Sequence, residues 1–470
     1  MNCNRREFLR RSIHTALGGV TVFSALGNMQ LMAAAAAAEK GGIFPDYKAL
    51  ICVFLNGGND SFNTIVPYDN THYNIYNATR PAMAIAQSAV AARNLVPLAQ
   101  QGSVPGGPPS DGGSYGLHPS MPHLQSLFNA GRAAVIANVG PLLGRITQAQ
   151  YQGTHPRPPQ LFSHDDQANF WQTSRPDNAN ANGWGGRIAD LLYEGNPNQA
   201  LPMTMSLSGQ SLFQRGQNID QYVMSAYGVD TIDYLGAYQN SLGTQTFNAL
   251  MASGVQNHMF ERAYAGATRR SISTYQMLQT ALSPLPTWTT PFPDNSLGIQ
   301  LRQVANLINV RGNGALNMRR QIFYVSLGGF DTHDDQLDVQ AGILGSLSSA
   351  LSAFYEATVQ MGIASQVTAF TASDFGRTLS TNGDGTDHGW GGHHFVVGGA
   401  VRGARFYGQM PALQQLSNPD DAGYGQIIPT TSVDQYAASL ASWFGVGPSG
   451  LADIFPNLGL YSDPNLGFMA

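Results

Sequence analysis

Five short runs of apolar residues organise the chain. Each is apolar at consecutive positions rather than at every second one, which is typical of strands buried on both faces of a parallel sheet. The first run ends at a pair of glycines, as expected where a buried strand turns into a loop. The runs are residues 49–55, 133–140, 321–327, 366–371 and 394–400.

Helical segments lie between these runs, for example at residues 121–130 and 337–361. Strands that alternate with helices indicate an α/β fold, with a mostly parallel sheet sandwiched by helices. One region departs from this alternation. It is helical over residues 244–282, is then interrupted by prolines, and becomes helical again near residues 297–310. We interpret residues 201–315 as a largely helical insertion or cap.

The N-terminus has the parts of an export signal in the right order. Two adjacent arginines and a Phe-Leu pair resemble the twin-arginine motif, and a weakly apolar stretch and six alanines follow over residues 13–38. We therefore predict a signal peptide over residues 1–38, with the Tat translocase as export partner, and a mature α/β domain over residues 39–470. The location would be periplasmic or secreted, with no stable membrane span. The alternative is a basic amphipathic helix at the start of a soluble domain.

Charge and cysteine content exclude some classes of function. The formal net charge is −5, and only 11% of the residues are charged. The predicted signal holds four arginines and one glutamate, so its removal leaves about −8. A nucleic-acid partner would require a basic face, and we expect none. The mature chain keeps only Cys52, which we interpret as a buried structural thiol.

Candidate chemistry lies in the loops after the predicted strands, where open α/β sheets bind ligands. Imidazoles and carboxylates suit Zn or Mn, and carboxylates alone suit Mg or Ca. The sequence therefore predicts a divalent metal site with one or two ions; the rival interpretation is a hydrogen-bonded polar cluster without metal. Acidic residues and histidines gather in these loops at residues 57–61, 328–335, 372–378 and 387–394.

Four segments carry a family resemblance: LNGGNDSFN at 55–63, FSHDDQANFWQTS at 162–174, GGFDTHDDQ at 328–336, and SDFGRT with TDHGWGGHH at 373–394. The chain resembles a family of Tat-exported bacterial proteins, domain of unknown function 1501, over roughly residues 48–446, and is more distantly similar to the alkaline phosphatase and sulfatase superfamily. The resemblance implies an alkaline phosphatase-like core.

The superfamily resemblance also implies roles for these residues. Asp60 and Asp374 would hold one metal ion, and Asp331, His333 and His388 would hold the other. Two departures weaken the two-metal pattern and favour one well-formed site. Phenylalanine stands at position 375, directly after Asp374, where superfamily hydrolases usually have histidine. The spacing between Asp331 and His333 is also tighter than usual.

Ser163 matches the position of the superfamily's nucleophile, but Ser-x-x-Asp at residues 163–166 is also typical of a helix cap. One residue could serve both roles. We interpret His164 as a helix-surface histidine, with a ligand or an acid/base partner as the alternative. Arg377 would either clamp a substrate anion or pair with a nearby carboxylate. Of His393 and His394, at most one should face the site, because neighbouring side chains of a strand alternate.

Together these features predict a metal-dependent hydrolase of phosphate or sulfate esters, acting on a small-molecule or glycan ester. The alternative is a non-catalytic protein that retains the fold and binds an envelope component or glycan. An exported oxidoreductase is disfavoured, because the glycines at 57 and 58 do not form a G-x-G-x-x-G fingerprint and no cysteine cluster exists.

Overall fold

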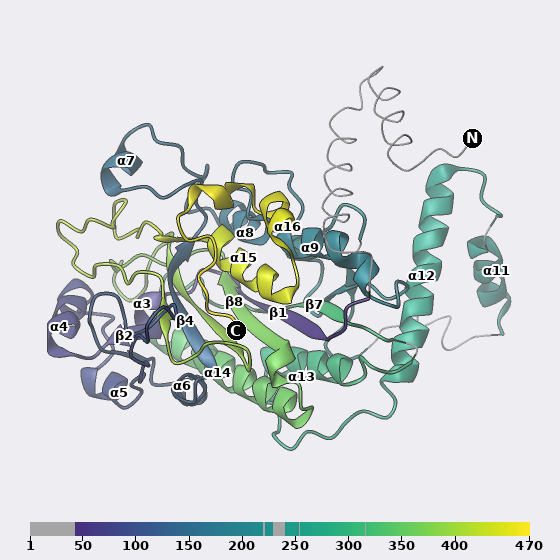
Figure 1. The fold of residues 1–470 in the computed structure, drawn as a ribbon, viewed down its shortest axis with the longest axis horizontal. Coiled ribbons are helices and arrows are strands. Elements are labelled where there is room, and N and C mark those ends of the chain that lie inside the picture. Colours follow the sequence, from purple (N-terminus) through teal and green to yellow (C-terminus); the bar gives the residue numbers. More distant parts are fainter. Residues whose placement is uncertain (1–42, 220, 229–239, 253, 315) are drawn as a thin grey trace.

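A computed structural model describes residues 43–219, 221–228, 240–252, 254–314 and 316–470. The predicted signal peptide lies outside the described residues. Within them, a nine-stranded sheet has the order β10-β4-β9-β8-β1-β7-β5-β6, and β11 pairs with β4 (Figure 1). Its strands are β1 (Lys48–Leu55), β4 (Ala133–Gly140), β5 (Thr204–Ser206), β6 (Tyr222–Val223), β7 (Arg320–Leu327), β8 (Val367–Ser373), β9 (Gly392–Gly398), β10 (Phe406–Tyr407) and β11 (Thr431–Ser432). A separate two-stranded sheet joins β2 (Ile65–Pro67) and β3 (Tyr115–Leu117).

All five predicted strands form, and the predicted α/β fold with a mostly parallel sheet is confirmed. β1 lies at the centre and pairs in parallel with β7 and β8, so that Ile51 is opposite both Phe323 and Ala369. β9 is the exception, because it runs antiparallel to β4 and β8. The carboxyl ends of β8, β1 and β7 therefore meet at one edge of the sheet.

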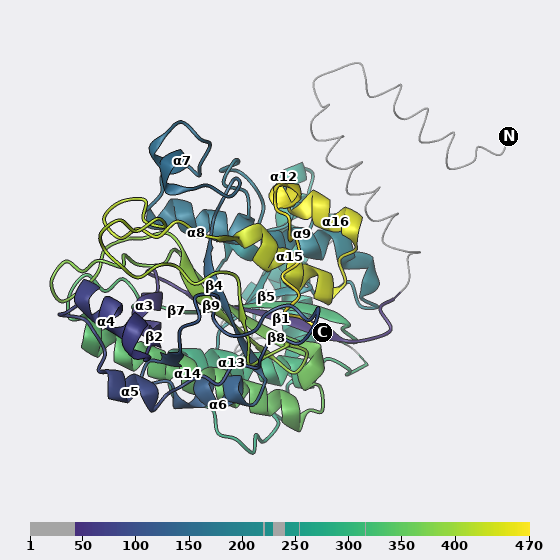
Figure 2. The same ribbon diagram turned by 60° about the vertical axis from the view of Figure 1, so that its left-hand side comes forward.

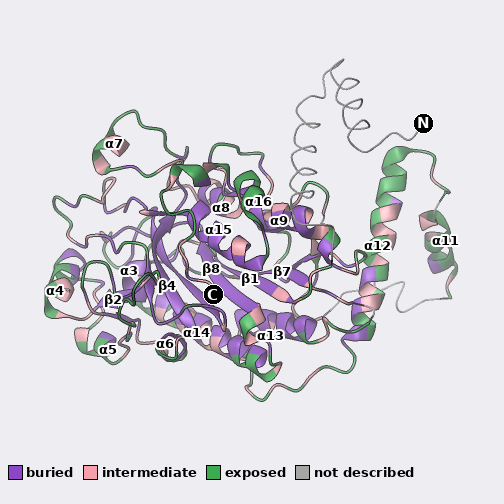
Figure 3. Cartoon of the chain, in the orientation of Figure 1, coloured by how far each residue is buried: buried purple, intermediate pink, exposed green. Residues whose placement is uncertain are grey.

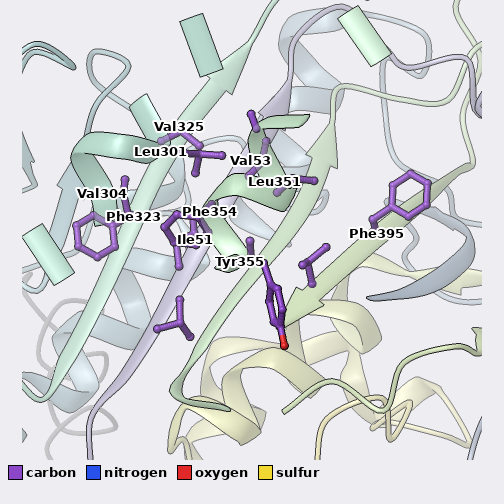
Figure 4. Close-up of a cluster of buried hydrophobic side chains, with 14 of the residues drawn as sticks. Ile51, Val53, Leu301, Val304, Phe323, Val325, Leu351, Phe354, Tyr355 and Phe395 are labelled. Atoms are coloured by element: carbon purple, nitrogen blue, oxygen red, sulfur yellow. The ribbon is translucent and has the colours of Figure 1, made fainter. Parts of the chain in front are cut away.

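Helices cover both faces of the sheet (Figures 1 and 2). Alternate residues of β1 enter two separate hydrophobic clusters. Ile51 and Val53 pack on the face of α6, α13 and α14 (Figure 4), whereas Phe54 packs on the face of α8, α9 and α15. The helices are α6 (Pro122–Asn129), α8 (His164–Thr173), α9 (Trp184–Leu192), α13 (Ser296–Asn309), α14 (Gln336–Gln360), α15 (Val433–Phe444) and α16 (Pro448–Ile454).

The region predicted as a helical insertion contains both sheet and helix. β5 extends the main sheet beside β7, and α13 packs against α14 and β7. By contrast, α11 (Leu242–Met251) and α12 (Met259–Ala281) stand away from the sheet (Figure 1), and most of their surface is exposed (Figure 3). The structure does not test the boundaries of 201 and 315, which stay a prediction.

Cys52 is a free thiol in β1 and is buried, as predicted. Burial raises the pKa of this thiol well above its usual value, so it is an inert core residue. None of the helices that the structure describes combines the length and apolar character needed to cross a membrane.

Candidate metal centre

Two glycines allow three loops to converge at the carboxyl edge of the sheet. Gly57 (φ +114°) and Gly58 (φ +83°) follow β1 directly. A Cβ atom on Gly57 would lie 2.4 Å from the backbone nitrogen of Asp331, and one on Gly58 would lie 2.3 Å from the Phe375 ring. Only residues without a side chain let the loops after β7 and β8 approach the end of β1 this closely.

Among the residues that the structure describes, the group that could hold a metal consists of His164, Asp331 and His388, whose ligating atoms all lie within 4.8 Å of one another. His164 is the first residue of α8, Asp331 follows β7, and His388 precedes β9. Nε2 of His164 lies 3.5 Å from one oxygen of Asp331, and Nε2 of His388 lies 3.4 Å from the other. Two imidazoles therefore face a single carboxylate.

Hydrogen bonds at the far side of both imidazoles orient them for binding a cation. Nδ1 of His388 donates to the main-chain carbonyl of Phe162 at 2.8 Å, since a carbonyl can only accept. Nδ1 of His164 lies 2.7 Å from the carboxylate of Asp374. With Nδ1 of His164 as the donor to this carboxylate, the Nε2 lone pairs of both histidines are available on the side of Asp331. Metal-binding histidines usually have such a carboxylate or carbonyl partner.

His333 lies on the exposed side of this group. Its Nε2 is 3.0 Å from Asp331 and 3.0 Å from Nε2 of His388, while its Nδ1 is 3.2 Å from Asp387. When both Nδ1 atoms donate to oxygen, two nitrogen lone pairs face each other at this distance. The two lone pairs repel unless a proton or a metal ion lies between them. On a tetrahedral ion, the ligating nitrogen atoms of two imidazoles are about 3.3 Å apart, which is close to this distance.

Asp331 carries the negative charge at the centre of the group. Partial burial would raise its pKa, but the hydrogen bond and the charge of Arg377, together with His164 and His333, outweigh that effect and lower it. For His388, burial lowers the pKa. Asp331 is therefore ionised and His388 neutral at pH 7, which are the states that a metal requires.

Asp374 provides an independent test of fit. Burial raises its pKa more than the hydrogen bond from His164 lowers it. Its Oδ2 also accepts from the backbone of Gly57 at 3.1 Å, whereas Oδ1 is buried and has no hydrogen-bond partner. A buried unsatisfied carboxylate oxygen at the edge of a His/Asp group favours a cation in this region. The donor set and this oxygen fit a divalent metal.

Phe375 occupies the position where the superfamily resemblance implied a histidine. Its ring is buried and lies 4.8 Å from the ring of His164 and 4.7 Å from that of His388, measured between centroids. The phenylalanine therefore forms an apolar wall that supports both imidazoles and contributes no ligand.

The two predicted catalytic residues have firm structural roles. Ser163 is the N-cap of α8, and its hydroxyl donates to the carboxylate of Asp166 at 2.7 Å. Arg377 is fully buried and donates to Asp331 at 2.7 Å, to Gly57, and to both oxygens of Thr386. Of the two alternatives for Arg377, the structure shows the ion pair with a carboxylate.

Of the predicted ligands, the structure brings together Asp331, His333 and His388, and Asp374 joins them through His164. Asp60 is placed differently. Its side chain is buried, forms an ion pair with Arg80 at 2.6 Å, and accepts a hydrogen bond from Gln336. Arg80 lies 20 residues further on, and no spacing rule connects it with Asp60.

His393 and His394 both lie within β9 and are buried. Nδ1 of His393 accepts from the backbone of Asn138 at 3.0 Å, and His394 packs against Trp171. These are contacts of core residues, so both histidines belong to the packed sheet rather than to the His/Asp group.

Sequence reasoning underrated His164. It belongs to the metal-binding group, although its place at the start of a helix indicated a surface residue. The available signal was its position next to Ser163, in one of the segments that carry the family resemblance.

The fold and the site define an α/β protein with a candidate His/Asp metal centre at the carboxyl edge of a mostly parallel sheet. The model of the family described as "Protein of unknown function (DUF1501)" matches residues 47–422, so the chain belongs to that family, as the sequence motifs predicted. No curated protein matches the chain.

Solved structures show distant likenesses. The lipoteichoic acid synthase LtaP from Listeria monocytogenes is 10% identical, with a TM-score of 0.35, over 89% of this chain and 76% of that one. The C-terminal periplasmic domain of EcEptC from Escherichia coli is 9% identical, with a TM-score of 0.33, over 87% of this chain and 85% of that one. The PsFucS1 sulfatase from Pseudoalteromonas sp. is 9% identical, with a TM-score of 0.29, over 92% of this chain and 77% of that one. At these low identities and TM-scores, nothing about the activity of this chain follows from the likenesses.

Proposed function

We propose that this protein is a metal-dependent hydrolase of phosphate or sulfate esters. The observation that carries the proposal is the group formed by His164, Asp331 and His388, in which hydrogen bonds to Nδ1 leave both Nε2 atoms free toward a charged carboxylate. These three residues would hold the ion, and His333 offers a further nitrogen beside them. A divalent ion supplies Lewis-acid polarisation of an ester oxygen.

The residues of the chain itself supply the nucleophile and the proton acceptor. The Ser163 hydroxyl already donates to Asp166, so its proton can pass to that carboxylate as Oγ attacks phosphorus or sulfur. The bond to the leaving alcohol breaks as the bond to Oγ forms, and the leaving oxygen takes up a proton. Water then hydrolyses the seryl ester and restores Ser163. The N-terminus of α8 favours the anionic group at this position.

Metal-stripped protein reloaded with Zn, Mn, Mg or Ca tests the proposal, with aryl phosphates, phosphodiesters and aryl sulfates as substrates. We expect turnover with at least one ion, and its loss in His388→Ala. His123→Ala is the control, because His123 is exposed on α6 and is not part of the His/Asp group. Absence of turnover with every ion, and of metal in the purified protein, would contradict it.

Glycan binding without turnover is the second candidate. A cavity of about 830 Å³ lies between the end of β5, β6 and the start of α13, at the same edge of the sheet as the candidate centre. Hydroxyl and amide side chains line it, including Ser208, Ser225 and Asn295, together with the exposed ring of Tyr227. Glycan binding that survives His388→Ala, with no ester turnover, would favour this role.

We also propose that the protein acts in the periplasm or outside the cell. The twin-arginine motif and the small-residue stretch before residue 39 support this location. Replacing Arg5 and Arg6 by lysine should keep the protein in the cytoplasm, as judged by cell fractionation. The same change at Arg10 and Arg11 is the control, and equal export of both variants would contradict the proposal.

A further inference from the structure

Asp60 and Arg80 form a fully buried ion pair. Neither side chain is exposed, and the guanidinium meets both carboxylate oxygens, at 2.6 and 3.2 Å. Nη1 of Arg80 also donates to Asn63 at 2.8 Å. A guanidinium that meets both oxygens supplies the positive charge that a buried carboxylate requires, so Asp60 needs no metal ion.

A continuous chain of hydrogen bonds leads from this ion pair to the candidate centre. The amide nitrogen of Gln336 donates to Asp60, and its amide oxygen accepts from the hydroxyl of Thr386 at 2.6 Å. The same hydroxyl accepts from Nε of Arg377 at 2.9 Å. Nη1 of Arg377 donates to Asp331 at 2.7 Å.

The direction of each hydrogen bond in this chain is determined by its neighbour. A carboxylate only accepts, so Gln336 must present its amide nitrogen to Asp60 and its oxygen to Thr386. The single hydroxyl hydrogen of Thr386 is then used, and only a lone pair is left for Arg377. Gln336, Thr386 and Arg377 are all fully buried, so water does not substitute for any of them.

We propose that Asp60 and Arg80 are positioning residues for Asp331, acting through Gln336, Thr386 and Arg377. The guanidinium of Arg80 stands where a second metal would bind Asp60, so the centre takes one ion. The inference rests on the metal site of the proposed function. Loss of an outer partner typically lowers metal affinity by about 10–100-fold.

Valine has nearly the same shape as threonine but no hydroxyl, so a substitution at Thr386 can interrupt the chain of hydrogen bonds between Asp60 and Asp331 with little change in packing. In Thr386→Val the side-chain link between Gln336 and Arg377 is lost, and Arg377 keeps only its hydrogen bonds to the main-chain oxygen of Thr386, whereas Thr386→Ser retains the link. Co²⁺ titration of the metal-free, full-length protein, followed by the visible absorption of the bound ion and by calorimetry, gives affinity and stoichiometry. We expect one equivalent in the wild type, affinity at least about tenfold lower in Thr386→Val, and affinity within about threefold of the wild type in Thr386→Ser.

Two glutamines on α14 provide a matched pair. Gln336 binds the Asp60 carboxylate, whereas Gln340, one turn further on and also buried, donates to the main-chain oxygen of Asp60 at 2.8 Å. Gln340 also accepts from Gln336 at 3.3 Å but contacts neither Thr386 nor Arg377. We expect Gln336→Met to weaken Co²⁺ binding as Thr386→Val does, and Gln340→Met to leave it near the wild-type value.

Thermal unfolding of the metal-free variants shows whether each one folds. Equal affinity in Thr386→Val and Thr386→Ser, or two bound ions in the wild type, overturns the inference, and so does a wild type that binds no Co²⁺. Co²⁺ binding with the expected order of variants, but without ester turnover in any metal form, supports the positioning role and refutes the hydrolase. The two failures are therefore distinguishable.

Discussion

Ser163 combines two roles that the sequence could not separate, a helix cap and a nucleophile. Its oxygen is in reach of the Asp166 backbone, as a cap requires, and its hydrogen points to the Asp166 carboxylate, as a nucleophile with a proton acceptor requires. Both contacts involve the same neighbouring residue, so geometry alone does not rank them.

Substitutions that keep one role and remove the other distinguish them. Asparagine is a good helix cap without a hydroxyl, and threonine retains both functions. If Ser163 is the nucleophile, Ser163→Asn should lose at least about a thousandfold in turnover at unchanged thermal stability. Ser163→Thr should stay active, and Ser163→Ala should also lose about 1 kcal/mol of stability. Full activity of Ser163→Asn would show that the serine is only a cap.

The sequence indicated most of the acidic and histidine residues of the site, because each follows a strand or precedes one. It did not reveal which of them are neutralised by a partner. Asp60 and Asp331 looked equivalent, yet one pairs with Arg80 in the core and the other, paired with Arg377, faces the imidazoles. Such pairings depend on tertiary contacts between distant residues, which no local pattern encodes.

At the scale of single elements, the long apolar runs predicted their strands well, because burial on both faces leaves an unambiguous pattern. The strands that were missed, β2, β3, β5, β6, β10 and β11, have only two or three residues, too few for any periodicity. The antiparallel direction of β9 was equally invisible, since direction follows from the path of the preceding loop.

A buried histidine in β9, His394, predicts how the stability of the protein depends on pH. Burial lowers the pKa of His394 to about 3, from 6.5. Between these values the unfolded chain binds a proton that the folded chain excludes, so the free energy of unfolding falls as the pH decreases from 6.5 toward 3. One such group contributes up to about 1.4 kcal/mol per pH unit.

Urea unfolding at pH 7 and pH 5 measures this effect. We expect the wild type to lose more stability between the two values than His394→Gln, whose side chain does not titrate. His123→Gln, on the exposed side of α6, is the control and should follow the wild type. Equal losses in the wild type and His394→Gln would show that this histidine does not govern the acid response.

At the scale of the whole molecule, the architecture explains why the candidate centre lies where it does. Three adjacent parallel strands end at one edge, two glycines let their loops close, and α8 brings its N-terminus to the same point. The apolar pattern of the sequence predicted that edge. The position of α8 was not predictable, since it depends on how α8 packs against β8 and the neighbouring helix α9.

The central claim is that one divalent ion binds among His164, Asp331 and His388. Anomalous diffraction at the zinc edge, from crystals of metal-stripped protein soaked in Zn²⁺, tests it most directly. We predict one strong peak about 2.0–2.2 Å from Nε2 of both histidines and from an Asp331 oxygen. A peak between Asp60 and Asp374, or no peak at the group, would contradict it.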